Sequence, residues 1–462
     1  MTSVKPVLDA LCPAVLRTYK ARIEASPLGY RLARGAFWSL IGTVLSRSLS
    51  VVSSILVARM LGKVGMGELG IIQSTVGIFS AFAGLGMGLT ATKFVAEYRA
   101  KDPRRAGAVL GLSASVSWAS GAVMSLAMFV LAPWFAQHTL AAPQLAGMIR
   151  VGSVLLLIGS VNGAQTGALA GFEAFKTIAR LNLICGLLSF PLMVGGTWWL
   201  GLVGAVWGLN GSVAVNCLFS HLALRREAAA AGVPFSATLQ PNQWGMLWRF
   251  SLPSVLCNVI FGPANWACSA LLVNRPNGYA EMGVFNVALS WFNAVSFLPG
   301  VLALVILPVL SSQAAEAGYG SQKKIVALAI RANAIAVIPV ALFIACVSPL
   351  IMSFYGAGFR EGWPTLVVTV VTAAILAVQV PLAQAITASG RMWIMFFTHV
   401  SYGVLYFGLT FAMVEWGALG LSTARLFAYI VNAVWVWWFA SKYIWADTRA
   451  GTMNAASPPE SA

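Results

Sequence analysis

Residues 36–58 read AFWSLIGTVLSRSLSVVSSILVA, an unbroken stretch of apolar and small residues that holds one charged side chain, Arg47. An α-helix rises about 1.5 Å per residue, so a stretch of this length covers the roughly 30 Å of hydrocarbon in a bilayer. Two basic residues, Arg31 and Arg34, stand just before it. The pattern predicts a membrane-spanning helix that begins next to a basic flank.

The same pattern recurs along the whole chain. Of the 462 residues, 59% are hydrophobic and only 9% are charged, whereas a soluble domain has roughly 25% charged residues. We therefore expect an all-α polytopic membrane protein with about 12 transmembrane helices. The apolar stretches fall near 36–57, 68–90, 107–131, 149–170, 177–199, 203–222, 251–273, 283–308, 326–350, 364–386, 394–414 and 419–441.

The net charge of +16 has a topological explanation. Most of the 29 Lys and Arg residues lie in alternate connecting segments, beginning with the basic segment 1–34. Such a bias follows the positive-inside rule, and we expect no nucleic-acid partner. The rule predicts a multi-pass protein of the cell inner membrane with both termini in the cytoplasm. It also places a linker at 225–248 in the cytoplasm, together with a polar tail at 446–462 that we expect to be disordered.

Similar motifs recur at a nearly fixed spacing. ELGIIQ at Glu68 matches EMGVFN at Glu281, and GLVGA at Gly201 matches GALGL at Gly417. The offsets agree with a duplicated unit of six spans. We expect an N-terminal lobe at 35–224 and a C-terminal lobe at 249–445, in parallel orientation around a central cavity.

Polar residues form a stripe on the first span and on the seventh. On the first, Ser46 and Ser50 belong to a series of Ser and Thr residues at steps of three and four, which share one helix face. On the seventh, Asn258 and Asn265 follow the same spacing. Either close helix packing or a water-filled cavity explains such stripes. The asparagines favour a cavity, and we take these residues as candidates for substrate binding.

Arginines within or beside the spans are the sharpest candidates. A charge at mid-membrane costs at least about 2.5 kcal/mol, and no acidic residue lies at the depth of Arg47. An anionic substrate is one partner for Arg47, and a structural ion pair is the alternative. In the twelfth span, Arg425 shares a face with Asn432, and it either lines the cavity or reaches the outer surface. Arg275, at the end of the seventh span, is a weaker candidate than Arg47 and Arg425. Its alternative role is that of an interfacial anchor.

Cysteine and histidine show no metal-binding pattern. The six cysteines form no CxxC pair, and the three histidines form no HExxH motif. We expect no metal and no cofactor.

Longer motifs resemble a known family. VARMLGKVGMGELGIIQS at 57–74, GLGMGLTATKFVAEYRAKDPRRAG at 84–107 and GALAGFEAFKTIARLNLICGLLSFP at 167–191 are similar to the polysaccharide (Wzx-type) flippases. These belong to the multidrug/oligosaccharidyl-lipid/polysaccharide exporter superfamily. The resemblance implies two lobes of helices that flip a polyprenyl-diphosphate-linked oligosaccharide by alternating access. By position, Arg47 matches a cationic cavity residue that would meet the diphosphate.

The resemblance also implies partners and alternatives. A polysaccharide polymerase and glycosyltransferases would act on the same lipid-linked sugar, for O-antigen or exopolysaccharide. A lipid II flippase is one alternative, and a cation-coupled multidrug exporter is another. The exporter needs acidic groups in its cavity, whereas Glu68 and Glu281 stand at span entrances. The connecting segments are short and lack acidic pairs, so an enzyme is not expected.

Overall fold

The computed structural model describes residues 27–234, 259–316, 319–388 and 392–443. These residues form helices joined by short turns. The helices are α3 (Pro27–Ala83), α4 (Met87–Tyr98), α5 (Pro103–Trp134), α6 (Ala146–Gly171), α7 (Phe175–Ala230), α10 (Phe261–Val273), α11 (Gly278–Glu316), α12 (Tyr319–Phe354), α13 (Trp363–Ala388), α14 (Met392–Met413) and α15 (Gly417–Tyr443).

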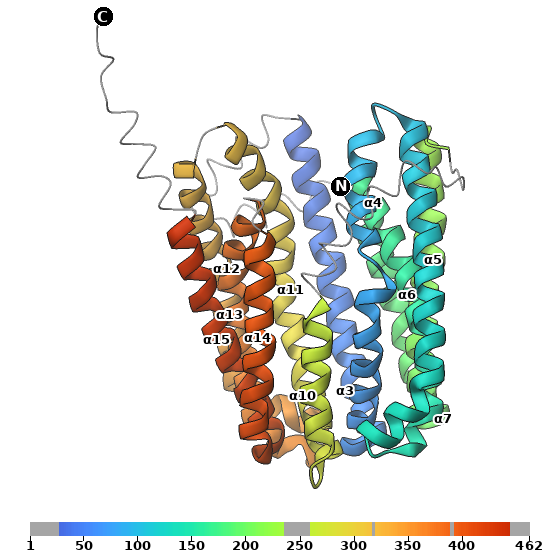
Figure 1. The fold of residues 1–462 in the computed structure, drawn as a ribbon, viewed down its shortest axis with the longest axis vertical. Coiled ribbons are helices and arrows are strands. Elements are labelled where there is room, and N and C mark those ends of the chain that lie inside the picture. Colours follow the sequence, from blue (N-terminus) through green and yellow to red (C-terminus); the bar gives the residue numbers. More distant parts are fainter. Residues whose placement is uncertain (1–26, 235–258, 317–318, 389–391, 444–462) are drawn as a thin grey trace, which may run out of the picture.

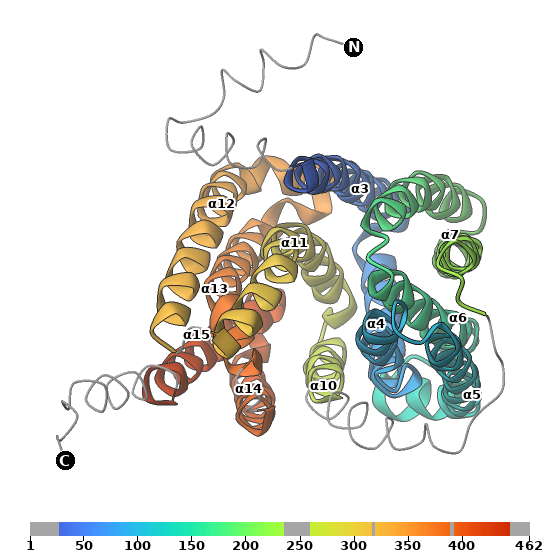
Figure 2. The same ribbon diagram turned by 90° about the horizontal axis from the view of Figure 1, so that it is seen from above.

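The helices run up and down in two lobes (Figure 1). Helices α3 to α7 make the first lobe and α10 to α15 make the second, as the view along the helices shows (Figure 2). Helix α7 ends at Ala230, so the first residues of the predicted linker are helical, and residues 235–258 lie outside the described part. The predicted all-α architecture of two lobes is confirmed.

Two of the helices each contain two spans. Gly62 in α3 and Gly201 in α7 adopt positive φ values of 68° and 57°, which reverse the chain between two antiparallel helical halves. Such values suit glycine, because it has no Cβ to strain. Within the described residues, seven segments are long and apolar enough to cross a membrane, and the segments containing Gly62 and Gly201 are among them.

A break divides the second span. Helix α3 stops at Ala83, Leu85 and Gly86 have positive φ values, and α4 restarts at Met87. Two residues of one span thus leave the helical conformation. Backbone irregularity at membrane depth is tolerated where it is covered by protein or lines a cavity. Helix α4 packs on α5 and α6, which cover it from one side.

The duplication is visible in the backbone. Gly201 turns the fifth span into the sixth with φ 57° and ψ −133°, and Gly417 turns the eleventh into the twelfth with φ 61° and ψ −136°. Exposed tryptophans stand beside both turns, Trp198 and Trp199 at the first and Trp416 at the second. Tryptophans at such positions anchor helices in the membrane interface. The two lobes therefore repeat one hairpin design.

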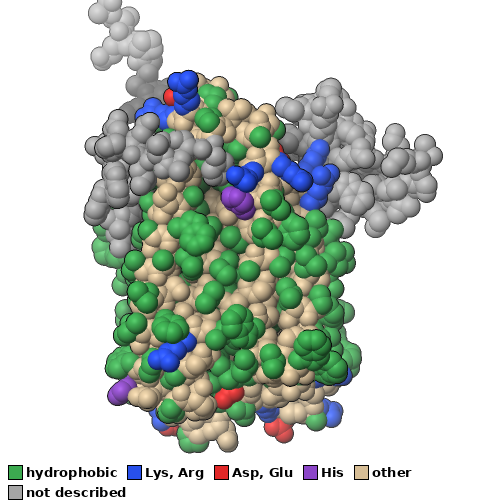
Figure 3. Space-filling model, turned by 90° about the vertical axis from the view of Figure 1, so that its right-hand side faces the viewer, with side chains coloured by type: hydrophobic (Ala, Val, Ile, Leu, Met, Phe, Trp, Pro, Cys, Tyr) green, Lys and Arg blue, Asp and Glu red, His purple; other side chains and the backbone are tan. Residues whose placement is uncertain are grey.

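The surface has an apolar belt with charge toward its ends. On the face formed by the first lobe, hydrophobic side chains cover the middle, and Lys and Arg gather mostly above and below (Figure 3). Among the exposed apolar residues are Leu126, Val130 and Leu222. A soluble protein would not expose so many, and the belt fits a lipid environment. The chain is thus a multi-pass membrane protein.

The lobes touch at one end of the bundle. We call this the hairpin end; it carries the turns at Gly62, Gly201 and Gly417 and is the lower end in Figure 1. A Cβ on Gly67 of α3 would lie 1.8 Å from the carbonyl oxygen of Tyr279 in α11. The backbones of the two lobes are therefore in direct contact, as small residues allow.

Hydrogen bonds reinforce this closure. Asn286 Nδ2 donates to the carbonyl oxygen of Met66 over 3.2 Å. The Tyr279 hydroxyl donates to the carbonyl oxygen of Leu140 over 2.8 Å. Trp266 Nε1 donates to Thr75 Oγ1 over 3.2 Å. Each bond joins one lobe to the other. The hairpin end is closed in this conformation.

Candidate functional site

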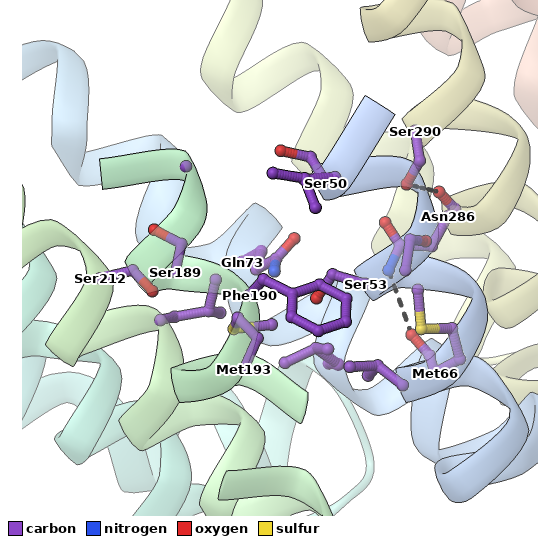
Figure 4. Close-up of a pocket in the computed structure, with 16 residues that line it drawn as sticks. Ser50, Ser53, Met66, Gln73, Ser189, Phe190, Met193, Ser212, Asn286 and Ser290 are labelled. Carbon is purple, nitrogen blue, oxygen red and sulfur yellow. Dashed lines mark hydrogen bonds between the residues drawn. The ribbon is translucent and has the colours of Figure 1, made fainter. Parts of the chain in front are cut away.

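A cavity of about 290 Å³ lies between the lobes, and both polar and apolar side chains form its wall. Its walls come from both halves of α3 and of α7 in the first lobe, and from α11 in the second. Figure 4 shows Ser50, Ser53 and Gln73 of α3, Ser189, Phe190 and Ser212 of α7, and Asn286 and Ser290 of α11 around it. The remaining lining residues are Leu49, Ser54, Val57, Met66, Leu69, Gly186, Met193 and Leu209. Uncharged side chains thus form its wall.

The hydroxyl groups of this wall present acceptors to the cavity. Ser50 donates its proton to the carbonyl oxygen of Ser46 over 3.0 Å, and Ser212 donates to that of Gly208 over 2.7 Å. Ser290 donates to the Asn286 carbonyl oxygen over 3.1 Å. Each of these three serines donates its hydroxyl proton to a carbonyl oxygen of its own helix, so the lone pairs of its oxygen stay free. The wall can therefore accept hydrogen bonds from ligand hydroxyls.

Other groups of the wall supply donors and an apolar surface. The exposed side-chain amide of Gln73 offers two N–H groups as well as an acceptor oxygen. The Ser53 hydroxyl is buried and has no hydrogen-bond partner among the described residues. Phe190 lies within the cavity beside Met193 (Figure 4). Neutral hydrogen-bonding groups around an aromatic ring suit a polyhydroxylated ligand with apolar ring faces.

Arg47 lies one helical turn before Ser50 on α3, which places the two on neighbouring parts of one face. Its side chain is exposed, and its Cζ lies 5.6 Å from the ring centroid of Phe297 in the other lobe. Among the residues whose side chains the structure describes, none forms a salt bridge with it. A cation is thus held beside the polar cavity and at the junction of the lobes.

The other predicted residues of the first and seventh spans have mixed surroundings. Ser46 packs on Gly186 of α7, where an added Cβ would lie 2.2 Å from the Ser46 Oγ. Asn265 Nδ2 donates to the carbonyl oxygen of Phe261 in its own helix over 2.7 Å. Asn258 lies outside the described residues. Ser46 therefore packs against a neighbouring helix and Asn265 bonds its own helix, and substrate contact by them stays a prediction.

The C-terminal candidates lie away from the cavity. Arg425 and Asn432 are 8% and 7% exposed, and both are inside the second lobe. Asn432 accepts from Gln379 and donates to the carbonyl oxygen of Thr398 over 2.8 Å. Arg275 is exposed at the turn between α10 and α11, where it borders a surface depression at the hairpin end. The structure brings together Ser46, Arg47 and Ser50 but not these three.

Several cavity residues were not among the predicted candidates. Gln73, Ser189, Phe190, Ser212 and Asn286 lie in the second, fifth, sixth and eighth spans, outside the two spans whose polar stripes supplied the candidates, although Ser212 and Asn286 each begin a polar series at helical spacing. Only the packing of α7 and α11 on α3 brings them together. Gln73 could have been selected from the sequence, because it lies in the motif at 57–74 that resembles the flippase family. In the described part of the chain, no group of three or more His, Cys, Asp or Glu residues could hold a metal ion.

Solved structures share this arrangement. An inward-facing multidrug resistance MATE family transporter of the MOP superfamily superposes with a TM-score of 0.70 and 17% identity, over 89% of this chain and 96% of that chain. A eukaryotic MATE transporter, AtDTX14, gives 0.70 at 14% identity, over 93% and 99%. This protein thus has the fold of the two-lobe, twelve-helix membrane transporters.

The family follows from the sequence. The family model described as polysaccharide biosynthesis protein matches residues 32–314, and the chain belongs to that family. The EPS I polysaccharide export inner membrane protein EpsE of Ralstonia solanacearum is 24% identical over 70% of this chain and 71% of its own length. The lipid III flippase of Escherichia coli K12 is 24% identical over 61% and 67%. These matches confirm the resemblance to polysaccharide flippases.

Proposed function

We propose that this protein flips a polyprenyl-diphosphate-linked oligosaccharide across the inner membrane by alternating access, for surface or exopolysaccharide synthesis. The observation that carries the proposal is an exposed arginine, Arg47, that forms no salt bridge with the described side chains and lies beside an uncharged cavity with many polar groups between two lobes. A ligand for both features has an anionic group joined to a neutral polar one. The names of the relatives, a polysaccharide export protein and a lipid III flippase, support this reading.

Arg47 is suited to the diphosphate. A guanidinium has a planar array of N–H donors that matches phosphate oxygens in pairs, and it stays charged at any physiological pH. Phe297 stacks near the guanidinium without neutralising it. Because Arg47 lies at the junction of the lobes, a diphosphate bound there would contact both of them.

The cavity is suited to part of the sugar. Its volume of about 290 Å³ lies near the lower limit for small-molecule pockets, roughly 300–1,000 Å³. The serine oxygens accept from sugar hydroxyls, Gln73 donates to ring or glycosidic oxygens, and Phe190 covers an apolar ring face. The polyprenyl chain stays in the lipid.

Alternating access requires an end that opens. The hairpin end is closed here by the contact between Gly67 and Tyr279. The opposite end carries many of the basic residues, among them Lys93, Arg105 and Arg180. By the positive-inside rule, we place that end and both termini in the cytoplasm, with 225–248 as a cytoplasmic linker between lobes at 35–224 and 249–445. A polymerase and glycosyltransferases are the partners that this role implies.

The test is lipid flipping in vesicles. Purified protein is reconstituted with a fluorescent polyprenyl-diphosphate oligosaccharide, and the accessible fraction is followed with a membrane-impermeant quencher. We expect flipping by the wild type, a loss of about ten-fold or more for Arg47→Ala, and partial recovery for Arg47→Lys. The matched control is Arg150→Ala, because Arg150 also stacks on a phenylalanine, with its Cζ 5.2 Å from the Phe129 ring centroid, but lies away from the cavity.

Two outcomes would contradict the proposal. If folded wild-type protein does not flip the lipid, the proposed function is wrong. If Arg47→Ala is fully active, the proposed role of Arg47 is wrong. Drug efflux without sugar-lipid flipping would favour an exporter. The proposed orientation is tested by labelling single cysteines at the hairpin end with an impermeant maleimide in intact cells; labelling at the opposite end instead would reverse it.

A further inference from the structure

A guanidinium lies in the interior of the second lobe, apart from the cavity between the lobes. The Cζ of Arg425 in α15 is 4.3 Å from the ring centroid of Phe292 in α11 and 5.8 Å from that of Tyr429. Two rings of α14 continue the cluster, because the ring centroid of Tyr402 lies 4.8 Å from that of Tyr429 and 5.8 Å from that of Tyr406. These four rings and Arg425 form what we call the arginine cage. Tyr402 and Tyr406 are only 2% and 1% exposed, so the cage is closed to bulk water.

The cage lies deep in the membrane. Arg425 is about 12 Å from the turn at Gly417, as measured along α15 at 1.5 Å per residue. This places the charge near the centre of a bilayer whose hydrocarbon is roughly 30 Å thick. A charge at that depth requires compensation by a partner.

No carboxylate is placed to compensate it. Helices α10, α12, α13, α14 and α15 contain neither Asp nor Glu, and α11 contains them only at its ends, as Glu281 and Glu316. Glu281 is used at the hairpin end, where its Oε2 accepts from the backbone N–H of Ala418 over 2.8 Å. The aromatic faces attract the cation, but they bring no negative charge. Arg425 is thus a buried cation without an anion.

The cage contains no negatively charged acceptor. Arg425 Nε and the Tyr402 hydroxyl are buried and have no hydrogen-bond partner of good geometry among the described residues, and the hydroxyl of Tyr429, which interacts with both side chains, is neutral. The guanidinium can only donate, and a tyrosine hydroxyl donates readily to an anion. The missing partner is therefore an acceptor. A water molecule would accept these bonds, but it would leave the buried charge uncompensated.

We propose that the arginine cage binds a small monovalent inorganic anion, with chloride as the abundant example. Arg425 supplies the charge, and the hydroxyl of Tyr402 donates a hydrogen bond. The residues of the cage are almost fully buried, which favours a small and weakly hydrated anion over a phosphate group. The anion would compensate the buried charge of the second lobe. It would also stabilise α11, whose Asn286 bonds Met66 of the first lobe.

The inference does not depend on what the protein transports, and it is tested on purified protein in detergent. The first measurement is equilibrium binding of radioactive chloride. The second is the thermal unfolding midpoint in sodium chloride and in sodium gluconate at equal ionic strength. We expect saturable binding of one chloride per chain and a higher midpoint in chloride.

Variants locate the site. Arg425→Gln should abolish binding. Tyr402→Phe keeps the ring and its packing and removes one donor, so it should weaken binding about ten-fold or more. Arg150→Gln removes an exposed arginine that also stacks on a phenylalanine, and it should bind chloride like the wild type. If Arg425→Gln does not fold, Tyr402→Phe and the wild-type measurement still decide.

The proposal would be overturned by wild-type protein that binds no chloride and unfolds at the same temperature in both salts. It would also be overturned by chloride binding that survives unchanged in Tyr402→Phe and in a folded Arg425→Gln. If chloride does not bind but the protein flips lipid, only the anion site is refuted. If chloride binds but the protein does not flip lipid, only the transport proposal is refuted.

Discussion

The contact between Gly67 and Tyr279 makes closure of the hairpin end sensitive to a single methyl group. A Cβ at Gly67 would lie 1.8 Å from the Tyr279 carbonyl oxygen and 2.8 Å from its carbon. Carbon and oxygen atoms in weak contact normally stay about 3.3–3.6 Å apart. In Gly67→Ala, α3 and α11 must therefore separate by roughly 1.5 Å at this level, which breaks the closure.

The size of the effect follows from overpacking. Inserting a methyl group into a close-packed contact costs typically about 1–3 kcal/mol. Because only the closed state contains the contact, the ratio of closed to open molecules should fall by about 5- to 150-fold. The variant should populate a state that is open at the hairpin end and should flip lipid more slowly, because it recloses poorly.

Distances between spin labels measure this shift. The exposed positions Val64 and Asn277 flank the contact from opposite lobes, and they are labelled as cysteines after the six native cysteines are replaced. Gly67→Ala should lengthen the distance between the labels. The control is Gly77→Ala on the same helix, where a Cβ meets nothing within 4 Å. Wild-type distances in Gly67→Ala, or an equal shift in Gly77→Ala, would refute the reasoning.

Three further predictions concern stability and the saccharide. Gly201→Ala should lower the free energy of unfolding by about 1–2 kcal/mol, because an alanine is strained at its positive φ. Gly417→Ala should lower it more, because the added Cβ would also lie 2.5 Å from Glu281. Thermal unfolding compares the two variants, and equal losses would contradict this account. Ile149→Ala, at a fully buried position, should cost about 2–5 kcal/mol in the same assay, so a loss below about 1 kcal/mol would mean that the site is not close-packed. Phe190→Ala should weaken saccharide binding more than Phe190→Leu does, as measured by competition with free oligosaccharide, and equal affinities would argue against stacking on the ring.

The sequence predicts the spans well because the bilayer imposes a length on each of them. The stretch 36–58 and the first half of α3 coincide for this reason, and the repeat of Gly201 at Gly417 reappears as equal backbone angles. The break at Gly86 was not predicted. Its neighbours are as apolar as the rest of the span, and hydropathy does not register a change of φ.

The candidate site was less predictable, because it is assembled from different helices. Ser50 belongs to a stripe that is visible in one span, and it lies in the cavity wall. Phe190 and Asn286 come from other helices, and the sequence does not show that these helices meet α3 at the cavity. The sequence marks Arg425 as costly, but its surroundings of Tyr402 and Phe292 arise only from the packing of α11, α14 and α15.

The equal turns at Gly201 and Gly417 give the last span of each lobe a common starting point. At the same distance beyond them stand Leu209 and Arg425, one in the wall between the lobes and the other in the arginine cage. The duplicated backbone was kept while the electrostatics diverged. A membrane potential exerts force only on charge. Where the first lobe has an apolar side chain, the second has a charge, on which the transmembrane field acts whenever the proposed anion is absent.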